Sequence, residues 1–167
     1  SVEAVREALR SQLLEMMRDR ARDREVRSLI QALIERNPFD VPRPMVTERA
    51  QTLVESIAAQ LMDGMSQAMS ASLDDLDDEK RSQVLEEAEF SSRRELILEA
   101  VGRQEGIRLE DGDFDAGIEA MAAQTGQPAE ALRSALLRGG MSRFEAKLLD
   151  DKIIEWLLER AEIVTEG

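Results

Sequence analysis

Three aspartates at alternating positions come nearest to metal-binding chemistry in this sequence. Asp111, Asp113 and Asp115 would present carboxylate oxygens as the first part of a calcium loop does. Such a loop also needs Gly at its sixth position and a bidentate Glu at its twelfth, and these positions hold Ala116 and Ala122. We therefore interpret the segment as the start of a helix, where Asp is favoured by the positive end of the helix dipole. No metal site is expected.

Catalytic chemistry has few candidate groups in this chain. It contains no His, Cys or Tyr, so proton transfer would fall to carboxylates or Lys, and metal ligation to oxygen atoms alone. Neither a glycine-rich phosphate loop nor a dinucleotide fingerprint is present. The acidic run of residues 74–79 is interpreted as a solvated turn and helix N-terminus. We expect no catalytic residue, no cofactor and no enzyme activity in this segment.

The composition is that of a helical protein. Of the 167 residues, 43% are apolar, 34% are charged and only 3% are aromatic, so aliphatic side chains and Met must fill the core. The net charge of −13 argues against direct nucleic-acid binding, which needs a basic face. No apolar run approaches the ~20 residues that span a bilayer, and the lack of Cys suits the cytoplasm. We expect an all-α cytoplasmic domain with neither a membrane nor a nucleic-acid partner.

The N-terminal sequence predicts one long helix, from Val2 to about Arg36. At 1.5 Å per residue it would be ~50 Å long, whereas a compact domain of this size is ~40 Å across, so we expect the helix to project as an arm. Its apolar stripe contains Val2, Val5, Leu9, Leu13 and Met16. Residues 18–25 are charged except for Ala21, and we expect this stretch to be solvated.

A proline-rich hinge follows the first helix. Residues 37–46 hold three of the four prolines, and proline fixes its own φ and disfavours helix in the preceding residue. We expect a stiff corner between two long helices, with the hinge residues Pro38, Phe39, Val41, Pro42 and Pro44. Phe39 and Val41 are interpreted as packed against a neighbouring helix. The second helix is predicted from about Pro44 to Met69.

Methionines concentrate in the first two helices and their hinge. Six of the eight lie there, namely Met16, Met17, Met45, Met62, Met65 and Met69. Flexible, polarizable side chains suit a surface that accepts many apolar partners, and ordinary packing between helices explains them equally well. The apolar stripe of the second helix is wider than one partner helix needs, so part of it is expected to be unburied.

The remaining sequence predicts a polar turn and four more helices. The turn covers residues 70–78, and a third long helix with a polar middle runs to about Glu105 and is ended by Gly106. A helix capped by Asp111 or Asp113 stops at Gly126, and another opens at Pro128. The last begins at a capping box, Ser142 to Glu145, and is expected to bury Leu149, Ile153, Trp156 and Leu157. We expect one domain over residues 1–167, made of a hairpin (1–72) and a remainder (73–167).

Several short segments occur in a specific order along nearly the whole chain. They are Ser1-Val2-Glu3, residues 33–37 followed by Phe39-Asp40-Val41-Pro42, residues 99–111, Met121-Ala122 with Gly126-Gln127-Pro128, and residues 157–161 with Val164-Thr165-Glu166. Together they resemble the C-terminal domain of bacterial trigger factor, a family of ribosome-associated chaperones. The resemblance implies an elongated all-α domain in which long antiparallel helices form arms around a smaller helical core.

The resemblance also implies a function. Such a domain would act as a holdase that binds unfolded or nascent polypeptides without ATP, on the inner faces of its arms. From the spacing of apolar residues, we place client contacts at Leu13, Met16, Met17, Leu61, Met62, Met65 and Met69. In the family, a ribosome-binding domain and a prolyl isomerase domain precede this one. Because Ser1 is not an initiator Met, we expect a segment of a longer protein that reaches the ribosome only through a missing domain.

Two alternatives stay open at this point. One is a helical assembly protein whose exposed stripes pair with a second copy of the chain. The other is a periplasmic chaperone of the SurA type, which resembles trigger factor in its helical part.

Overall fold

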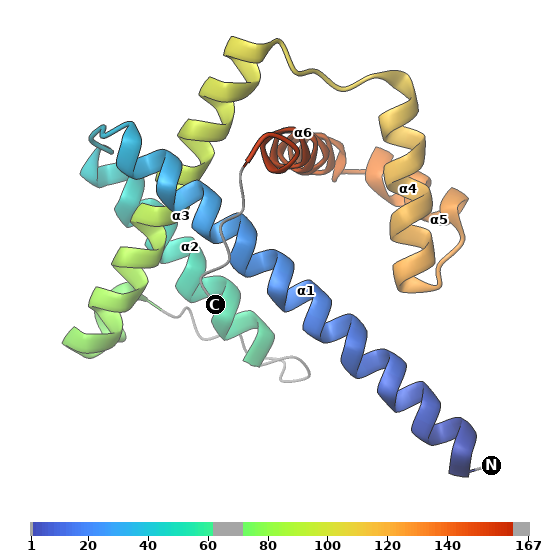
Figure 1. Cartoon of the computed structure of the whole chain (residues 1–167). Helices are drawn as coiled ribbons and strands as arrows, with labels where there is room; N and C mark the ends of the chain where they lie inside the picture. Colours follow the sequence, from blue (N-terminus) through green and yellow to red (C-terminus); the bar gives the residue numbers. More distant parts are fainter. Residues whose placement is uncertain (1, 62–71, 162–167) are drawn as a thin grey trace. The chain divides into compact units, whose positions relative to one another are not determined.

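The computed structural model describes residues 2–61 and 72–161. In these ranges the chain forms helices α1 (Val2–Arg36), α2 (Arg43–Leu61), the short 3₁₀ helix η1 (Leu73–Asp75), α3 (Asp78–Glu105), α4 (Asp111–Thr125), α5 (Ala129–Leu137) and α6 (Met141–Leu158) (Figure 1). The described ranges contain no strand. The all-α prediction is therefore confirmed.

The chain divides into two compact units, which are described separately. The first contains residues 1–31 and 98–167, and the second contains residues 32–97. Helices α1 and α3 each contribute residues to both units. The expected grouping into a 1–72 hairpin and a 73–167 remainder stays a prediction.

The connection between α1 and α2 is short and closed at both ends by hydrogen bonds. At its start, the side-chain Nδ2 and the backbone N–H of Asn37 donate to the Leu33 carbonyl oxygen at 2.9 and 3.1 Å. At its end, the N–H of Met45 donates to the Pro42 carbonyl oxygen at 3.0 Å. Helix α2 thus begins at Arg43 with Pro44 in its first turn, where proline is tolerated. The connector covers residues 37–42.

In the second unit, α2, η1 and α3 share an apolar core. Ala50, Val54, Leu73 and Ala88 are buried there. Leu73 lies in the segment predicted to be a polar turn, and that prediction is wrong for this residue. Its side chain is buried while its N–H donates to Gln51 Oε1 at 3.0 Å. A single leucine beside an acidic run is enough to anchor the turn on α2.

The polar middle predicted for α3 also needs correction. Ser92 is fully buried, and its hydroxyl donates to the Ala88 carbonyl oxygen at 2.8 Å. Because the hydroxyl is satisfied within its own helix, a small polar side chain is accommodated in the core.

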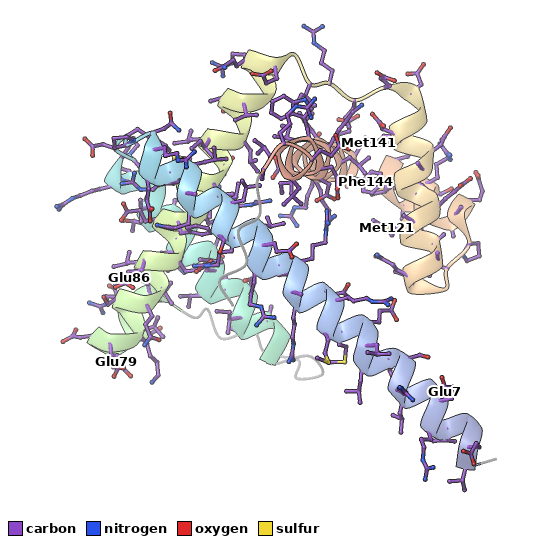
Figure 2. The ribbon with its side chains drawn as sticks, viewed as in Figure 1. Glu7, Glu79, Glu86, Met121, Met141 and Phe144 are labelled. Carbon is purple, nitrogen blue, oxygen red and sulfur yellow. The ribbon has the colours of Figure 1, made fainter. Side chains whose placement is uncertain are left out.

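In the first unit, α4, α5 and α6 pack around three buried residues, Ile118, Leu132 and Phe144. The rings of Phe114 and Phe144 meet edge to face, with centroids 5.3 Å apart. Figure 2 shows Met121 of α4 and Phe144 of α6 directed into the region between these two helices. Met121 is half-buried there and serves as core filler.

Helix α6 begins earlier than predicted. Gly140 is its N-cap residue, and the N–H of Phe144 donates to the Gly140 carbonyl oxygen at 3.0 Å. Ser142 therefore lies inside the first turn, so the predicted capping box is wrong. Ile153 and Leu157 are buried as predicted, whereas Leu149 and Trp156 are only half-buried. The Arg160 guanidinium covers the Trp156 ring at 4.1 Å from its centroid.

Two glycines end helices α3 and α4, and two other glycines permit close packing within the same helices. Gly106 and Gly126 both have φ of 68°, a left-handed conformation that favours glycine, and the stops predicted there are confirmed. Within α3 and α4, a Cβ on Gly102 would lie 2.8 Å from Ile153 Cδ1, and one on Gly117 would lie 2.5 Å from Leu148 Cδ2. Helix α6 therefore approaches α3 and α4 at positions that have no side chain.

Candidate functional site: an exposed apolar strip on the first helix

The N-terminal half of α1 exposes large apolar side chains on successive turns. We call this set the apolar strip. Its members are 47% to 80% exposed, and they are Val2, Val5, Leu9, Leu13, Leu14, Met16 and Met17. Single exposed apolar residues are ordinary on a protein surface, but a contiguous row of them marks a contact surface.

The helical repeat places the strip along one side of α1. Val5, Leu9, Leu13 and Met17 recur at every fourth residue, so their side chains lie one above the other. An open depression of about 500 Å³ runs along them and is lined by Val2, Val5, Arg6, Leu9, Arg10, Leu13, Leu14 and Met17. Because all of these residues belong to one helix, the depression is a shallow surface between side chains. It suits an extended or helical segment lying along it.

The strip ends where α1 becomes charged. Of residues 18–25, all except Ala21 are exposed, as predicted. Arg22 forms an ion pair with Glu155 of α6. The same helix thus changes from an apolar surface to a solvated one, and then to the buried positions Ile30 and Ile34.

The structure places part of the sequence-predicted client surface on this strip. Leu13, Met16 and Met17 belong to it. The side chain of Leu61 and all of Met62, Met65 and Met69 lie outside the described residues. Val2, Val5, Leu9 and Leu14 also belong to the strip. They were not among the predicted contact residues, although the first three were part of the predicted stripe. The signal was present, but the prediction gave more weight to Met than to Val and Leu.

The predicted hinge residues belong to the second unit, whereas the strip belongs to the first. Phe39 and Val41 are half-buried, whereas Pro38, Pro42 and Pro44 are exposed. The guanidinium of Arg93 donates to the Phe39 carbonyl oxygen and lies 5.4 Å from the centroid of its ring. The hinge is therefore held against α3 within its own unit.

Two of the three alternating aspartates, Asp113 and Asp115, form ion pairs between helices. Asp113 of α4 accepts from Lys152 Nζ of α6 at 2.6 Å and from the Glu110 N–H at 2.9 Å. Both hydrogen bonds, chiefly the one from Lys152, lower the pKa of the Asp113 carboxyl below its usual value. The same bond between Lys152 and Asp113 raises the pKa of the Lys152 ammonium group. Asp115 accepts from Arg133 of α5 at 2.7 Å. Residues 111–115 form the first turns of α4, and the carboxylates of Asp113 and Asp115 tie this helix to α6 and α5.

Neither a metal site nor a membrane span emerges from the described residues. They contain no group of three or more carboxylate, His or Cys side chains placed to hold a metal ion. None of the helices in those ranges combines the length and apolarity needed to cross a bilayer. The apolar strip is therefore the candidate site.

Comparison with known proteins gives consistent matches. The family model described as bacterial trigger factor protein (TF) C-terminus matches residues 1–159. The trigger factor of Geotalea uraniireducens is 32% identical over 138 residues, which are 81% of this chain and 31% of the relative. That of Pelotomaculum thermopropionicum is 27% identical over 176 residues, covering 99% of this chain and 39% of the relative. The trigger factor of Geobacter metallireducens is 29% identical over 167 residues, covering 96% of this chain and 38% of the relative.

The extent of these matches defines what they establish. The chain spans 31% to 39% of the length of these curated relatives. No solved structure matches it. Because the family model covers residues 1–159 of the 167, the chain belongs to the family of the bacterial trigger factor C-terminus.

Proposed function

We propose that this domain is an ATP-independent chaperone domain that holds unfolded polypeptide segments against the apolar strip of α1. One observation carries the proposal: seven large apolar side chains of α1 are about half exposed or more on consecutive turns. Family membership supports it, because the relatives are trigger factors. The alternatives of an assembly protein and of a SurA-type chaperone are not favoured by these matches.

The energetics favour weak, reversible binding. Complete burial of one such side chain is worth about 1.5 to 3 kcal/mol, and contact along a shallow strip buries only part of each. Association itself costs about 4 to 15 kcal/mol in lost freedom and ordering. One strip therefore holds a client briefly, and a second patch on the same domain would raise the avidity.

We place the second patch at Leu61, Met62, Met65 and Met69, from the sequence pattern alone. Replacing these four residues with Ser is expected to reduce suppression of client aggregation while helicity, measured by far-ultraviolet circular dichroism, is retained. Unchanged suppression would exclude them as client contacts.

The strip itself is tested by the variant Leu9→Ser/Leu13→Ser/Met17→Ser. We expect it to lose most suppression of the aggregation of a chemically denatured client, measured by light scattering. The matched control is Glu7→Ser/Glu15→Ser/Arg18→Ser, which places three Ser residues on the same stretch of α1 at positions that do not line the depression. Figure 2 labels Glu7 on this helix. Equal suppression by the two variants would contradict the proposal.

Further activities are proposed for other parts of the trigger factor polypeptide. We propose that the intact protein is cytoplasmic, docks on the ribosome, receives nascent chains and isomerises prolyl bonds through domains outside this segment. The segment alone is then expected to bind unfolded polypeptide without isomerising proline and without binding ribosomes. A prolyl isomerase assay on the isolated chain tests the first of these expectations, and detectable catalysis would contradict it.

A further inference from the structure

The sulfur chemistry open to this chain is that of methionine. The sequence contains eight Met and no Cys, so methionine supplies all of its sulfur. A peroxide oxidises the methionine thioether to a sulfoxide, which is a polar group in place of an apolar one. Exposed thioethers meet the oxidant before buried ones do. The surroundings of each methionine therefore decide what an oxidant would change in this protein.

Of the methionines that the structure describes, the two in α1 are the most open to solvent. Met16 is 47% exposed and Met17 is 66% exposed. The other three in the described ranges are Met45, Met121 and Met141, and all of them are half-buried. Figure 2 shows the last of these in α6 and Met121 in α4, where it packs against the core of the three-helix cluster. A peroxide is therefore expected to react first with the thioethers of α1.

These two neighbours differ in their relation to the apolar strip. Met17 lines the depression together with Leu13 and Leu14, whereas Met16 is not among the lining residues. Consecutive residues of a helix point about 100° apart around its axis, so the two side chains face different directions. Both are within reach of an oxidant, but only Met17 would lie beneath a segment bound along the depression.

We propose that Met17 is an oxidation site through which a peroxide weakens client binding to the apolar strip. This inference rests on the proposed chaperone function and adds a regulatory site to it. In the forward step Met17 Sδ attacks one oxygen of hydrogen peroxide and the O–O bond breaks. The sulfur gives up two electrons and keeps that oxygen, while the other oxygen leaves with both hydrogens as water.

The modification can be reversed by known chemistry. A methionine sulfoxide reductase uses a dithiol as the source of two electrons and two protons. The sulfoxide oxygen leaves as water, the thioether is restored and the dithiol becomes a disulfide. Oxidation at this position would therefore act as a reversible switch on the strip.

A sulfoxide at Met17 should weaken binding because its oxygen needs a hydrogen-bond donor. Water satisfies this oxygen in the free chain, and an apolar segment covering the depression would remove that water. Complete burial of an unpaired polar group would weaken binding roughly 5- to 100-fold. Contact along a shallow depression leaves part of the group hydrated, so we expect a loss at the low end, about 5- to 10-fold.

The test uses the background Met62→Leu/Met65→Leu/Met69→Leu, so that sulfur in the proposed second patch does not contribute. The chain is treated with hydrogen peroxide, which catalase then removes, and peptide mass spectrometry quantifies the sulfoxide at each position. Binding of a labelled, permanently unfolded client without Met or Cys is measured by fluorescence anisotropy. Each variant is compared with its own unoxidised form, and far-ultraviolet circular dichroism checks that helicity is retained.

Two single substitutions in this background assign the effect. We expect oxidation to weaken client binding about 5- to 10-fold, and methionine sulfoxide reductases with dithiothreitol to restore it. Adding Met17→Leu should remove the loss, because leucine has a similar volume and no thioether. The matched control Met16→Leu should leave the loss in place. A loss that persists with Met17→Leu, or disappears with Met16→Leu, overturns the inference.

The remaining outcomes separate this inference from the proposed function. Unchanged binding by protein whose Met17 is fully oxidised overturns the oxidation site and leaves the chaperone function standing. The same holds if the Met17 thioether survives a treatment that converts Met16 to the sulfoxide. Failure of the unoxidised protein to bind the client overturns both.

Discussion

Arg93 of α3 holds both the backbone and the ring of Phe39. Its guanidinium donates to the Phe39 carbonyl oxygen and lies 5.4 Å from the centroid of the ring. The remaining nitrogens are used as well, because Nε and one terminal nitrogen donate to Glu89 Oε1 at 3.0 and 2.7 Å. With its side chain only 22% exposed, Arg93 is a fixed support for the connector between α1 and α2.

Removing this support should loosen the connector. We expect Arg93→Ala to lower the free energy of unfolding by about 2 to 4 kcal/mol, from the lost charged hydrogen bond and the lost cation–π contact. Amide hydrogen exchange of Phe39, Asp40 and Val41 should accelerate. Arg93→Lys should recover little, because an ammonium group cannot reproduce the planar fork. The control is Arg103→Ala, which removes an exposed arginine paired with Glu99 on the same helix. Identical amide hydrogen exchange of residues 39–41 in the two Ala variants would show that Arg93 does not support the connector.

Two glycines of α4 should respond in opposite directions to the same substitution. A Cβ on Gly112 meets nothing within 4 Å, so Gly112→Ala should stabilise the domain by about 0.5 to 1 kcal/mol through reduced backbone entropy. A Cβ on Gly117 would lie 2.5 Å from Leu148 Cδ2 and 3.1 Å from Phe144 Cζ. Overpacking there costs about 1 to 3 kcal/mol and outweighs the helix gain. Urea unfolding of both variants checks the signs, and stabilisation by both would mean that α4 and α6 are not closely packed.

The Asp113–Lys152 pair should make the free energy of unfolding depend on pH. The hydrogen bond from Lys152, followed by that from the Glu110 N–H, holds the pKa of Asp113 below its usual value in the folded state. A carboxyl group with a lowered folded-state pKa contributes stability above its unfolded pKa and loses it as the pH falls through the folded one. Asp113→Asn should therefore be destabilised at neutral pH and lose stability less steeply than wild type below about pH 4. The free energy of unfolding is measured by denaturant unfolding between pH 2.5 and 7, with Asp111→Asn as the control. If it depends on pH in the same way in wild type and in Asp113→Asn, the Asp113–Lys152 pair does not contribute to stability.

Most of the helices could be predicted because their ends carry strong local signals. Pro38 and Pro42 interrupt the chain after α1, and Gly106 and Gly126 adopt the left-handed conformation that ends α3 and α4. The errors lie where tertiary packing decides. Leu73 is buried although four aspartates follow it within five residues, and Ser92 is buried because its hydroxyl donates to the Ala88 carbonyl oxygen. The sequence around Ser142 matches the capping-box pattern, but α6 already begins after its N-cap residue Gly140, so Ser142 lies inside the helix.

The candidate site shows the same limit. Leu13 and Met17 belong to one long apolar pattern that continues to Ile30 and Ile34, yet the first two are exposed and the last two are buried. Periodicity identifies an apolar face, whereas only the packing of other elements shows which part of that face stays uncovered.

The most direct test of the account asks whether unfolded polypeptide touches the strip. A photo-crosslinking amino acid is placed at Leu13 and, in a second variant, at Ser11, which lies two residues earlier and so about 200° around the helix axis. Both variants are irradiated with a permanently unfolded client. Strong crosslinking is expected from position 13 and little from position 11. Equal crosslinking from both positions, or none from position 13 in a variant that still suppresses aggregation, would contradict it.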